Sequence, residues 1–225
     1  ELYQAHAQRL ALMLQNQTEE EFADSRFQVL SELTRLRQLC CDPALVYENY
    51  EGGSAKLDLC IELIRSAVEA GHKILLFSQF TTMIEILTAR LQEEKISYFV
   101  LQGNTKKEQR AQMVEQFNRD NTSVFCISLK AGGTGLNLTG ADIVIHYDPW
   151  WNVAVENQAT DRAHRIGQKN VVTVYKLIAE GTIEEKIIKL QQMKKELAEE
   201  ILSGDEIKTA SFQREELLAL LEDRF

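Results

Sequence analysis

The feature that most constrains the fold of this chain is the alternation of short, mostly apolar runs with longer segments of helical periodicity. A strand that is apolar on both faces must be covered on both faces, and parallel sheets built from strand–helix units meet this need. The sequence therefore predicts an α/β fold with a parallel sheet and helices on both faces. The predicted strands are Ile74–Phe77, Tyr98–Leu101, Val124–Ser128, Ile143–Tyr147 and Val171–Lys176.

The segments between and after the strands carry helix signals. Thr81–Glu94 and Thr105–Phe117 are predicted as helices of the sheet, and a long amphipathic helix is predicted from Thr182 onward. The last two begin with a threonine followed three residues later by a glutamate, Glu108 and Glu185, which is the spacing of a capping box.

Both ends of the chain look like helical appendages to the sheet. Apolar residues recur at helical spacing from Phe27 through Leu39, and Pro43 ends the run. The stretch EGGS at 51–54 is the best candidate for a linker, and a last short helix is predicted at 215–221. We therefore expect a helical segment at 1–50, an α/β lobe at 51–180, and a helix with a tail at 181–225.

Composition narrows the class of protein. Hydrophobic residues make up 44% of the chain, and no apolar run is long enough to cross a bilayer. No leader-like segment opens the sequence, so we expect no membrane association. The cysteines show no CxxC spacing, so we expect no metal site. Their pattern indicates a reduced intracellular compartment, which is the cytoplasm, nucleoid or nucleus depending on the organism. The cysteines are Cys40, Cys41, Cys60 and Cys126.

The net charge of −9 argues against a surface coated with nucleic-acid-binding charge. It leaves room for a local basic groove, because one stretch contains several cations and few acids. That stretch contains Arg162, Arg165, Lys169 and Lys176.

Unusual residues follow the predicted strands directly. In parallel sheets, working residues collect at the carboxyl ends of the strands. The clustering therefore favours a functional edge over scattered surface polarity. The residues are Ser78 and Gln79, Gly103 and Asn104, Lys130 to Gly135, and Asp148 to Trp151.

Two of these loops have two readings each. The glycines of KAGGTGL at 130–136 let backbone N–H groups approach a phosphate, or they serve a tight turn. The loop is not a Walker A motif. Trp150 and Trp151 are the chain's two tryptophans. One of them is expected to be at least half exposed and able to contact nucleic acid, although both can instead pack under the loop.

The stretch QATDRAHRIGQ at 158–168 places Arg162 and Arg165 about one helical turn apart, so both can leave the same face of a helix. A pair of planar, permanently charged guanidiniums matches phosphate oxygens. The alternative is an ordinary solvated helix face. We assign no catalytic role to His164, and we expect His146, inside a strand, to be a core histidine with its hydrogen bonds satisfied.

Taken in order, KILLFSQF, LQGNTKKEQR, SLKAGGTGLNLTGADIVIHYDPWWN and QATDRAHRIGQ resemble the second RecA-like lobe of the SWI/SNF-type helicase-like ATPases of helicase superfamily two. The resemblance runs from about Leu33, in a stretch similar to the family's interlobe segment, to about Leu202. The long helix after Thr182 resembles the family's brace. One departure is Val153, where the family usually has proline after DPWWN.

The resemblance implies roles for the residues that match the family's motifs. Arg162 and Arg165 would be arginine fingers that reach the γ-phosphate of ATP bound on the first lobe. The residues implied at the nucleotide are Gly135, Asn137, Gln158 and Asp161. Those implied at DNA are Ser78, Gln79, Gly103, Ser128, Lys130 and Trp151.

The sequence lacks a Walker A lysine and a DExH acid pair, which belong to the family's first lobe. We therefore expect half of a motor, the C-terminal piece of a longer protein, inactive alone and with ATP and Mg²⁺ held mainly by the absent lobe. The implied function is ATP-dependent translocation on duplex DNA and remodelling of protein–DNA complexes. Two alternatives stay open: a strand-separating DNA or RNA helicase, and a binding module without hydrolysis.

Overall fold

The computed structural model describes residues 1–129, 131, 135–164, 168, 170–200 and 221. The chain divides into two compact units, Gly52–Ile178 and a second one that joins Glu1–Glu51 to Ala179–Phe225. The predicted N-terminal segment and the predicted brace thus belong to one unit. The three domain boundaries expected from the sequence stay predictions. In the described part of the chain, no helix is both long and apolar enough to span a membrane.

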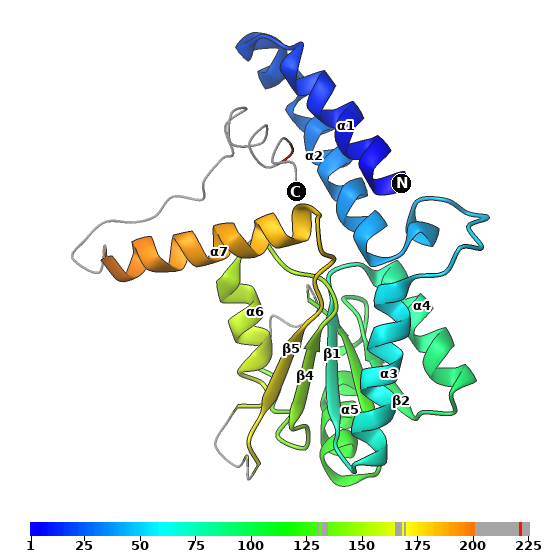
Figure 1. Ribbon diagram of the computed structural model, residues 1–225. Coiled ribbons are helices and arrows are strands. Elements are labelled where there is room, and N and C mark those ends of the chain that lie inside the picture. Colours follow the sequence, from blue (N-terminus) through cyan, green and yellow to red (C-terminus); the bar gives the residue numbers. More distant parts are fainter. Residues whose placement is uncertain (130, 132–134, 165–167, 169, 201–220, 222–225) are drawn as a thin grey trace. The chain divides into compact units, whose positions relative to one another are not determined.

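The unit Gly52–Ile178 is built on a five-stranded sheet in which every pair of neighbours is parallel (Figure 1). The strand order is β2-β3-β1-β4-β5, which places β1 at the centre. This confirms the parallel α/β sheet predicted from the apolar runs, and it agrees with the RecA-like lobe that the resemblance implies. The strands are β1 (Ile74–Ser78), β2 (Tyr98–Leu101), β3 (Val124–Ser128), β4 (Ile143–His146) and β5 (Thr173–Lys176).

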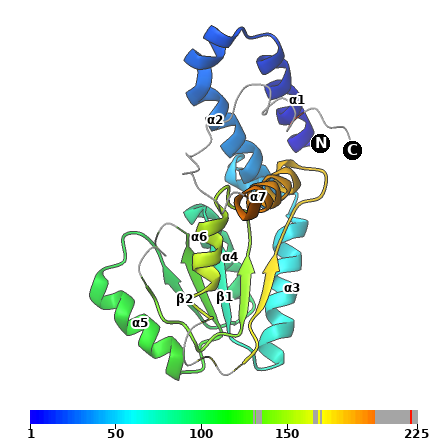
Figure 2. The same ribbon diagram turned by 90° about the vertical axis from the view of Figure 1, so that its left-hand side faces the viewer.

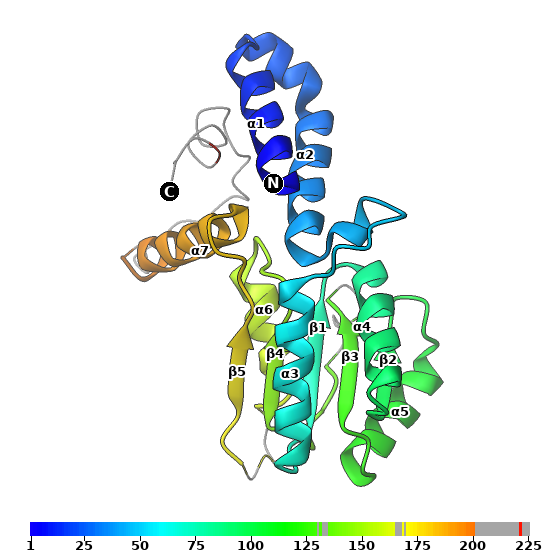
Figure 3. The same cartoon turned by 45° about the vertical axis from the view of Figure 1, so that its right-hand side comes forward.

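Helices cover both faces of the sheet. The connection from β1 to β2 runs across the sheet in one direction, and the connection from β2 to β3 runs in the opposite direction. Because connections of this kind are right-handed, the helix of the first lies on one face of the sheet and the helix of the second lies on the other face. In Figures 2 and 3, α3 lies on one face, and α5 and α6 lie on the other. The helices are α3 (Ala55–Glu69), α4 (Thr81–Glu93), α5 (Lys107–Arg119) and α6 (Val153–Thr160).

The core of this unit is formed by alternate residues of the central strands. Phe77 of β1, Phe125 of β3 and Val144 of β4 belong to one buried cluster together with Phe117 of α5 and Ala159 of α6. The residues between them on each strand are buried too. Burial of both faces explains why the central strands read as continuous apolar runs. β5 is an edge strand, and all four of its residues are exposed.

The other unit contains a helical hairpin and the predicted brace. The elements are α1 (Leu2–Gln15), α2 (Glu19–Cys41), the short 3-10 helix η1 (Pro43–Leu45) and α7 (Ile183–Glu200). The Tyr3 hydroxyl accepts a hydrogen bond of 2.6 Å from the Ile183 N–H, and this bond ties the start of α7 to α1. Burial raises the pKa of the Tyr3 phenol above its usual range.

Several local predictions were wrong. Thr105 does not cap α5, because its hydroxyl accepts from the Gln102 N–H at 3.1 Å and Lys106 is the N-cap residue. The Thr182 hydroxyl does accept from the Glu184 N–H at 3.2 Å, but Glu185 accepts from Gly181 instead of closing the box.

The apolar residues of α2 do not all lie on its buried face, which also includes Phe22 and Val29 of the first half. Leu33, Leu36 and Leu39 are buried, whereas Phe27 is 87% exposed and Leu30 is 52% exposed. The complete capping box of this unit, Thr18 with Glu21, precedes α2 and was not predicted. The short helix expected at 215–221 lies outside the described residues except for Leu221.

Candidate functional site at the carboxyl edge of the sheet

The buried carboxylate of Asp148 organises the centre of the carboxyl edge. It follows β4 and accepts a hydrogen bond of 2.5 Å from the Ser78 hydroxyl at the end of β1. Both carboxylate oxygens also lie 3.3 Å from the Gln79 backbone nitrogen, which donates to them. Asp148 is 1% exposed, so these donors replace water around a buried charge. The carboxylate thereby fixes the first turn after β1 to the start of the DPWWN loop.

The two serines predicted at DNA are buried. Ser78 is 0% exposed and Ser128 is 2% exposed, and the Ser128 hydroxyl accepts from the Ala131 N–H at 3.3 Å. Both hydroxyls are thus engaged within the chain, and their predicted contact with DNA stays a prediction. Gln79 is half-buried, and its side-chain nitrogen has no hydrogen-bond partner among the described residues.

Arg110 of α5 joins two loops at this edge by donating to four backbone carbonyls. Its Nε donates to Thr105 at 2.8 Å, and its Nη2 donates to Gln102 at 3.3 Å and to Gly103 at 3.0 Å. Its Nη1 donates to Ala131, inside the glycine-rich loop, at 3.1 Å. Gly103 is itself exposed, as its predicted role at DNA requires. Sequence reading missed Arg110, because nothing in the spacing shows that one guanidinium reaches both loops.

A shallow hollow of about 500 Å³ lies beside this clamp. It brings Gly135, predicted at the nucleotide, together with the cationic residues Lys107 and Arg110. Further along the same loop, the Asn137 side chain is exposed, and its backbone carbonyl accepts from Asn118 at 2.8 Å. The hollow is lined by Thr105, Lys107, Arg110, Ala111, Gly135 and Leu136.

The tryptophan loop is half-buried rather than open. Trp150 packs against the core cluster, and Trp151 is of intermediate exposure. The Trp150 N–H donates to the carboxylate of Glu156 at 2.6 Å, and Asn152 accepts from the Ala154 N–H at 3.0 Å to cap α6. The expectation that one tryptophan is at least half exposed is thus compatible with Trp151.

Arg162 lies beyond the end of α6, so the helix expected to carry both arginines is shorter than predicted. α6 ends at Thr160, and Asp161 is its C-cap. Arg162 is 4% exposed, and its guanidinium carbon lies 5.8 Å from the centroid of the Phe77 ring. Its backbone carbonyl accepts from the Leu138 N–H at 3.0 Å. Gln158 and Asp161, in contrast, are exposed.

His146 is buried, as predicted. Its ring stacks on Phe77 with centroids 5.5 Å apart, and its Nε2 lies 3.0 Å from the Thr160 hydroxyl. Nδ1 has no hydrogen-bond partner among the described residues, so the expectation of a fully satisfied ring is not met there. Burial lowers the pKa of His146 to about 4. The imidazole is therefore neutral at pH 7.

Gln168 is another residue whose role sequence reading missed. Its side-chain nitrogen donates to the carbonyls of Thr139 at 3.3 Å, Ala141 at 2.7 Å and Ala163 at 3.1 Å. The side chain thereby fastens the end of the arginine motif to the chain segment before β4. Its place inside the motif was visible in the sequence, but its partners were not.

Two predicted site residues, Lys130 and Arg165, lie outside the described residues. The predicted geometry of the arginine pair is therefore not observed. Among the described residues, no group of three or more acidic, histidine or cysteine side chains is arranged to hold a metal ion.

Comparison with known sequences matches this chain to proteins of one kind. A sequence profile of the helicase conserved C-terminal domain matches residues 55–167. An uncharacterized ATP-dependent helicase of Mycoplasma pneumoniae is 45% identical over 88% of the chain. The putative ATP-dependent helicase/translocase YwqA of Bacillus subtilis is 43% identical over 79%. The human chromatin-remodeling ATPase INO80 is 43% identical over 76%.

The chain spans only 19%, 20% and 11% of the lengths of these three relatives. Solved structures match it more completely. The C-terminal domain of the Sulfolobus solfataricus SWI2/SNF2 ATPase aligns over 100% of this chain and 92% of its own, with a TM-score of 0.77 and 31% identity. The ATPase core of the same protein in complex with dsDNA aligns over 90% of this chain and 42% of its own, with a TM-score of 0.74 and 34% identity.

Proposed function

This chain belongs to the helicase conserved C-terminal domain family and is a SWI2/SNF2-type C-terminal lobe, and from that premise we propose that it is the second motor lobe of an ATP-dependent duplex-DNA translocase. The first lobe, in the same polypeptide, would bind ATP. Closure of the two lobes around the nucleotide would drive movement along DNA. Remodelling of protein–DNA complexes inside the cell would be the outcome of that movement.

The observation that carries the proposal is the match to an ATPase core solved with dsDNA, at 34% identity over 90% of this chain. In addition, exposed loop residues such as Gly103 and Gly135 follow the carboxyl ends of the strands. Such an edge is where ligands bind in open parallel sheets.

The arginine fingers would stabilise charge on the γ-phosphate during phosphoryl transfer to water. Arg162 is 4% exposed and packs over Phe77. Its guanidinium must therefore turn outward, or the edge must open, when the lobes close. Arg165 would act with it. Because the sequence of this chain lacks a Walker A lysine and an acid pair, Mg²⁺ and most of the nucleotide contacts are left to the first lobe.

The other residues predicted at the nucleotide are exposed, as residues that face another lobe must be. Gly135, Asn137, Gln158 and Asp161 all lie open to solvent in this chain. We propose that Gln158 and Asp161 orient the arginine segment, and that the loop with Gly135 and Asn137 senses the nucleotide.

For DNA we retain Gln79, Gly103, Lys130 and Trp151 as contact residues. Ser78 and Ser128 are buried and would support the contacting loops. Half-burial of Trp151 suits an aromatic side chain that is anchored at its base and presents one edge to a groove.

Translocation without strand separation distinguishes this proposal from its rivals. In the full-length protein, we expect duplex DNA to stimulate ATP hydrolysis and ATP to drive displacement of a third strand from a triplex. The same preparation should not separate a forked duplex. Efficient ATP-dependent unwinding of the fork would favour the strand-separating helicase, and absence of nucleic-acid-stimulated hydrolysis would favour the binding module.

A further inference from the structure

Glu156, near the start of α6, has a buried carboxylate that joins three elements. It is 1% exposed. Its Oε1 accepts from the Trp150 N–H at 2.6 Å, and its Oε2 accepts from Lys176 Nζ of β5 at 2.7 Å. A buried carboxylate that is satisfied by a backbone donor and an ammonium group makes short, charge-assisted bonds. The carboxylate therefore holds the tryptophan loop, α6 and the edge strand at fixed distances from one another.

A second link fastens the same face of α6 one turn later. Thr160 lies four residues after Glu156, so the two side chains share a helix face. The Thr160 hydroxyl lies 3.0 Å from Nε2 of His146 on β4. His146 and Lys176 are cross-strand partners in the β4–β5 register. Two paired residues of β4 and β5 thus contact α6 at two points, which lie one helical turn apart.

We propose that Glu156 is a positioning residue that couples the tryptophan loop to the arginine segment. α6 begins at the loop containing Trp151 and ends directly before Arg162. With Glu156 in place, a displacement of Trp151 by DNA moves α6, and α6 moves Arg162. Without the carboxylate, this link between the loop, the helix and β5 is lost. This inference rests on the function proposed above, and it adds the path by which DNA contact would reach Arg162.

The decisive variant is Glu156→Gln in the full-length protein. The amide keeps the shape and an acceptor oxygen for Trp150, but it removes the charge that holds Lys176. We expect the ratio of DNA-stimulated to DNA-independent hydrolysis to fall about tenfold to a hundredfold, because misplacement by ~1 Å costs about that much in rate. The KM for ATP should stay unchanged. A merely structural role would lower both rates together through loss of folded protein.

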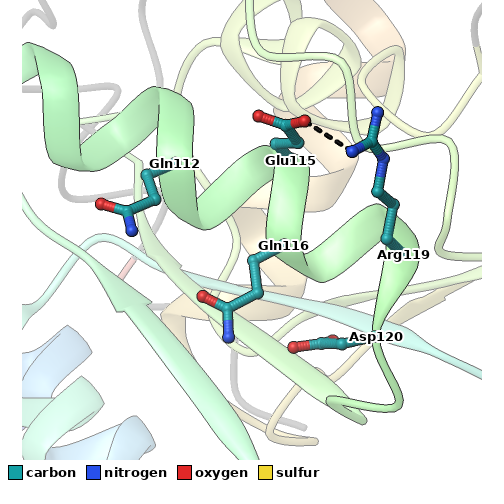
Figure 4. A pocket seen from close by; sticks show the side chains of 5 residues that line it. All are labelled: Gln112, Glu115, Gln116, Arg119 and Asp120. Carbon is teal, nitrogen blue, oxygen red and sulfur yellow. Dashed lines mark ion pairs between the residues drawn. The ribbon is translucent and has the colours of Figure 1, made fainter.

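Glu115→Gln is the matched control. Glu115 forms an ion pair of 2.7 Å with Arg119 on the outer face of α5, beside a shallow hollow (Figure 4). Both side chains of this pair are more than 60% exposed, at 63% and 77%. The substitution makes the same chemical change in a solvated pair, which contributes little to stability. It should leave the stimulation ratio at the wild-type value.

Tryptophan fluorescence gives an independent readout in this 225-residue chain, because both of its tryptophans lie in the loop that Glu156 holds. Acrylamide should quench Glu156→Gln more than wild type, and Glu115→Gln like wild type. If Glu156→Gln does not fold, Lys176→Met removes the other half of the pair and should change both readouts in the same direction.

The outcomes separate the inference from the function on which it rests. Wild-type stimulation by DNA with an unchanged ratio in Glu156→Gln and Lys176→Met would overturn the coupling role alone. Unchanged quenching would overturn the claim that Glu156 holds the loop. A wild-type protein that duplex DNA does not stimulate would overturn both proposals.

Discussion

Removal of the buried histidine of β4 should change how the stability of the chain depends on pH. Burial lowers the pKa of His146 to about 4, with Glu156 opposing the shift and Lys176 adding to it. In the unfolded chain the pKa of a histidine is about 6.5. Between these two values the unfolded state binds more protons at this position, so the free energy of unfolding falls as the pH is lowered. The stability that depends on neutral His146 is present above about pH 6.5 and is lost progressively toward pH 4.

The magnitude follows from the two pKa values. Linkage gives a loss of about 2 kcal/mol from this one group between pH 7 and pH 5. His146→Gln cannot be protonated, and its amide can still meet the Thr160 hydroxyl. Wild type should therefore lose about 2 kcal/mol more than the variant over this interval. Groups that do not interact with His146 are the same in both proteins, so their contributions cancel in the difference.

Urea denaturation of this chain, followed by tryptophan fluorescence at pH 7 and pH 5, measures the effect. His164→Gln is the matched control, because His164 is exposed, and it should follow wild type. A difference between wild type and His146→Gln below about 0.5 kcal/mol would refute the reasoning, because a desolvated imidazole must produce a larger one.

Three further predictions concern ligand binding and packing. Mg-ATP at sub-millimolar concentration should not shift the melting temperature of this chain alone, since the Walker A lysine is absent from its sequence; a saturable shift would contradict this. Trp151→Ala should cost less than about 3 kcal/mol of stability in chemical denaturation, and Trp150→Ala, which removes a residue packed on the core, should cost more. Gly140→Ala should cost about 1–3 kcal/mol, because its Cβ would lie 3.0 Å from Asn118 Cα; a neutral result would show that the loop yields.

The strands of the sheet were predictable because local pattern and tertiary environment agree there. β2 and β3 begin and end where the apolar runs do. β5 begins at Thr173 rather than at Val171, and Val171 is 90% exposed. The limits of an edge strand depend on which of its residues pair with a neighbouring strand. Hydrophobicity alone does not show where that pairing begins and ends.

Helix limits were predicted less well, because one local signal can serve two structures. The hydroxyl of Thr105 satisfies a turn before α5 instead of capping the helix. The spacing of Arg162 and Arg165 suited one continuous helix, but α6 ends at Thr160. Phe27 continues a helical apolar pattern and is nevertheless exposed, whereas Phe22 and Val29 on either side of it are buried, because periodicity alone does not show which helix face is packed.

The resemblance to the family's motifs pointed to the loops of the candidate site. The side chains that hold these loops in place could be identified only from the structure. Ser78 was predicted at DNA, and only the structure shows that its hydroxyl donates to Asp148, which is 70 residues away in sequence. Arg110 and Gln168 act through backbone groups of distant segments, and Glu156 joins the nearby Trp150 N–H to Lys176 of β5. Such contacts leave no spacing signal, since any residue type can supply a carbonyl or an N–H.

The central claim, that this lobe supplies arginine fingers to ATP held elsewhere in the same protein, is tested most directly by steady-state hydrolysis in the full-length protein. Arg162→Lys and Arg165→Lys keep the charge and lose the planar fork. At saturating duplex DNA, each should lower hydrolysis by about 10³-fold or more, while the affinities for ATP and DNA change little. Turnover by both variants within a few-fold of wild type would contradict the claim and leave Arg162 as a packing residue over Phe77.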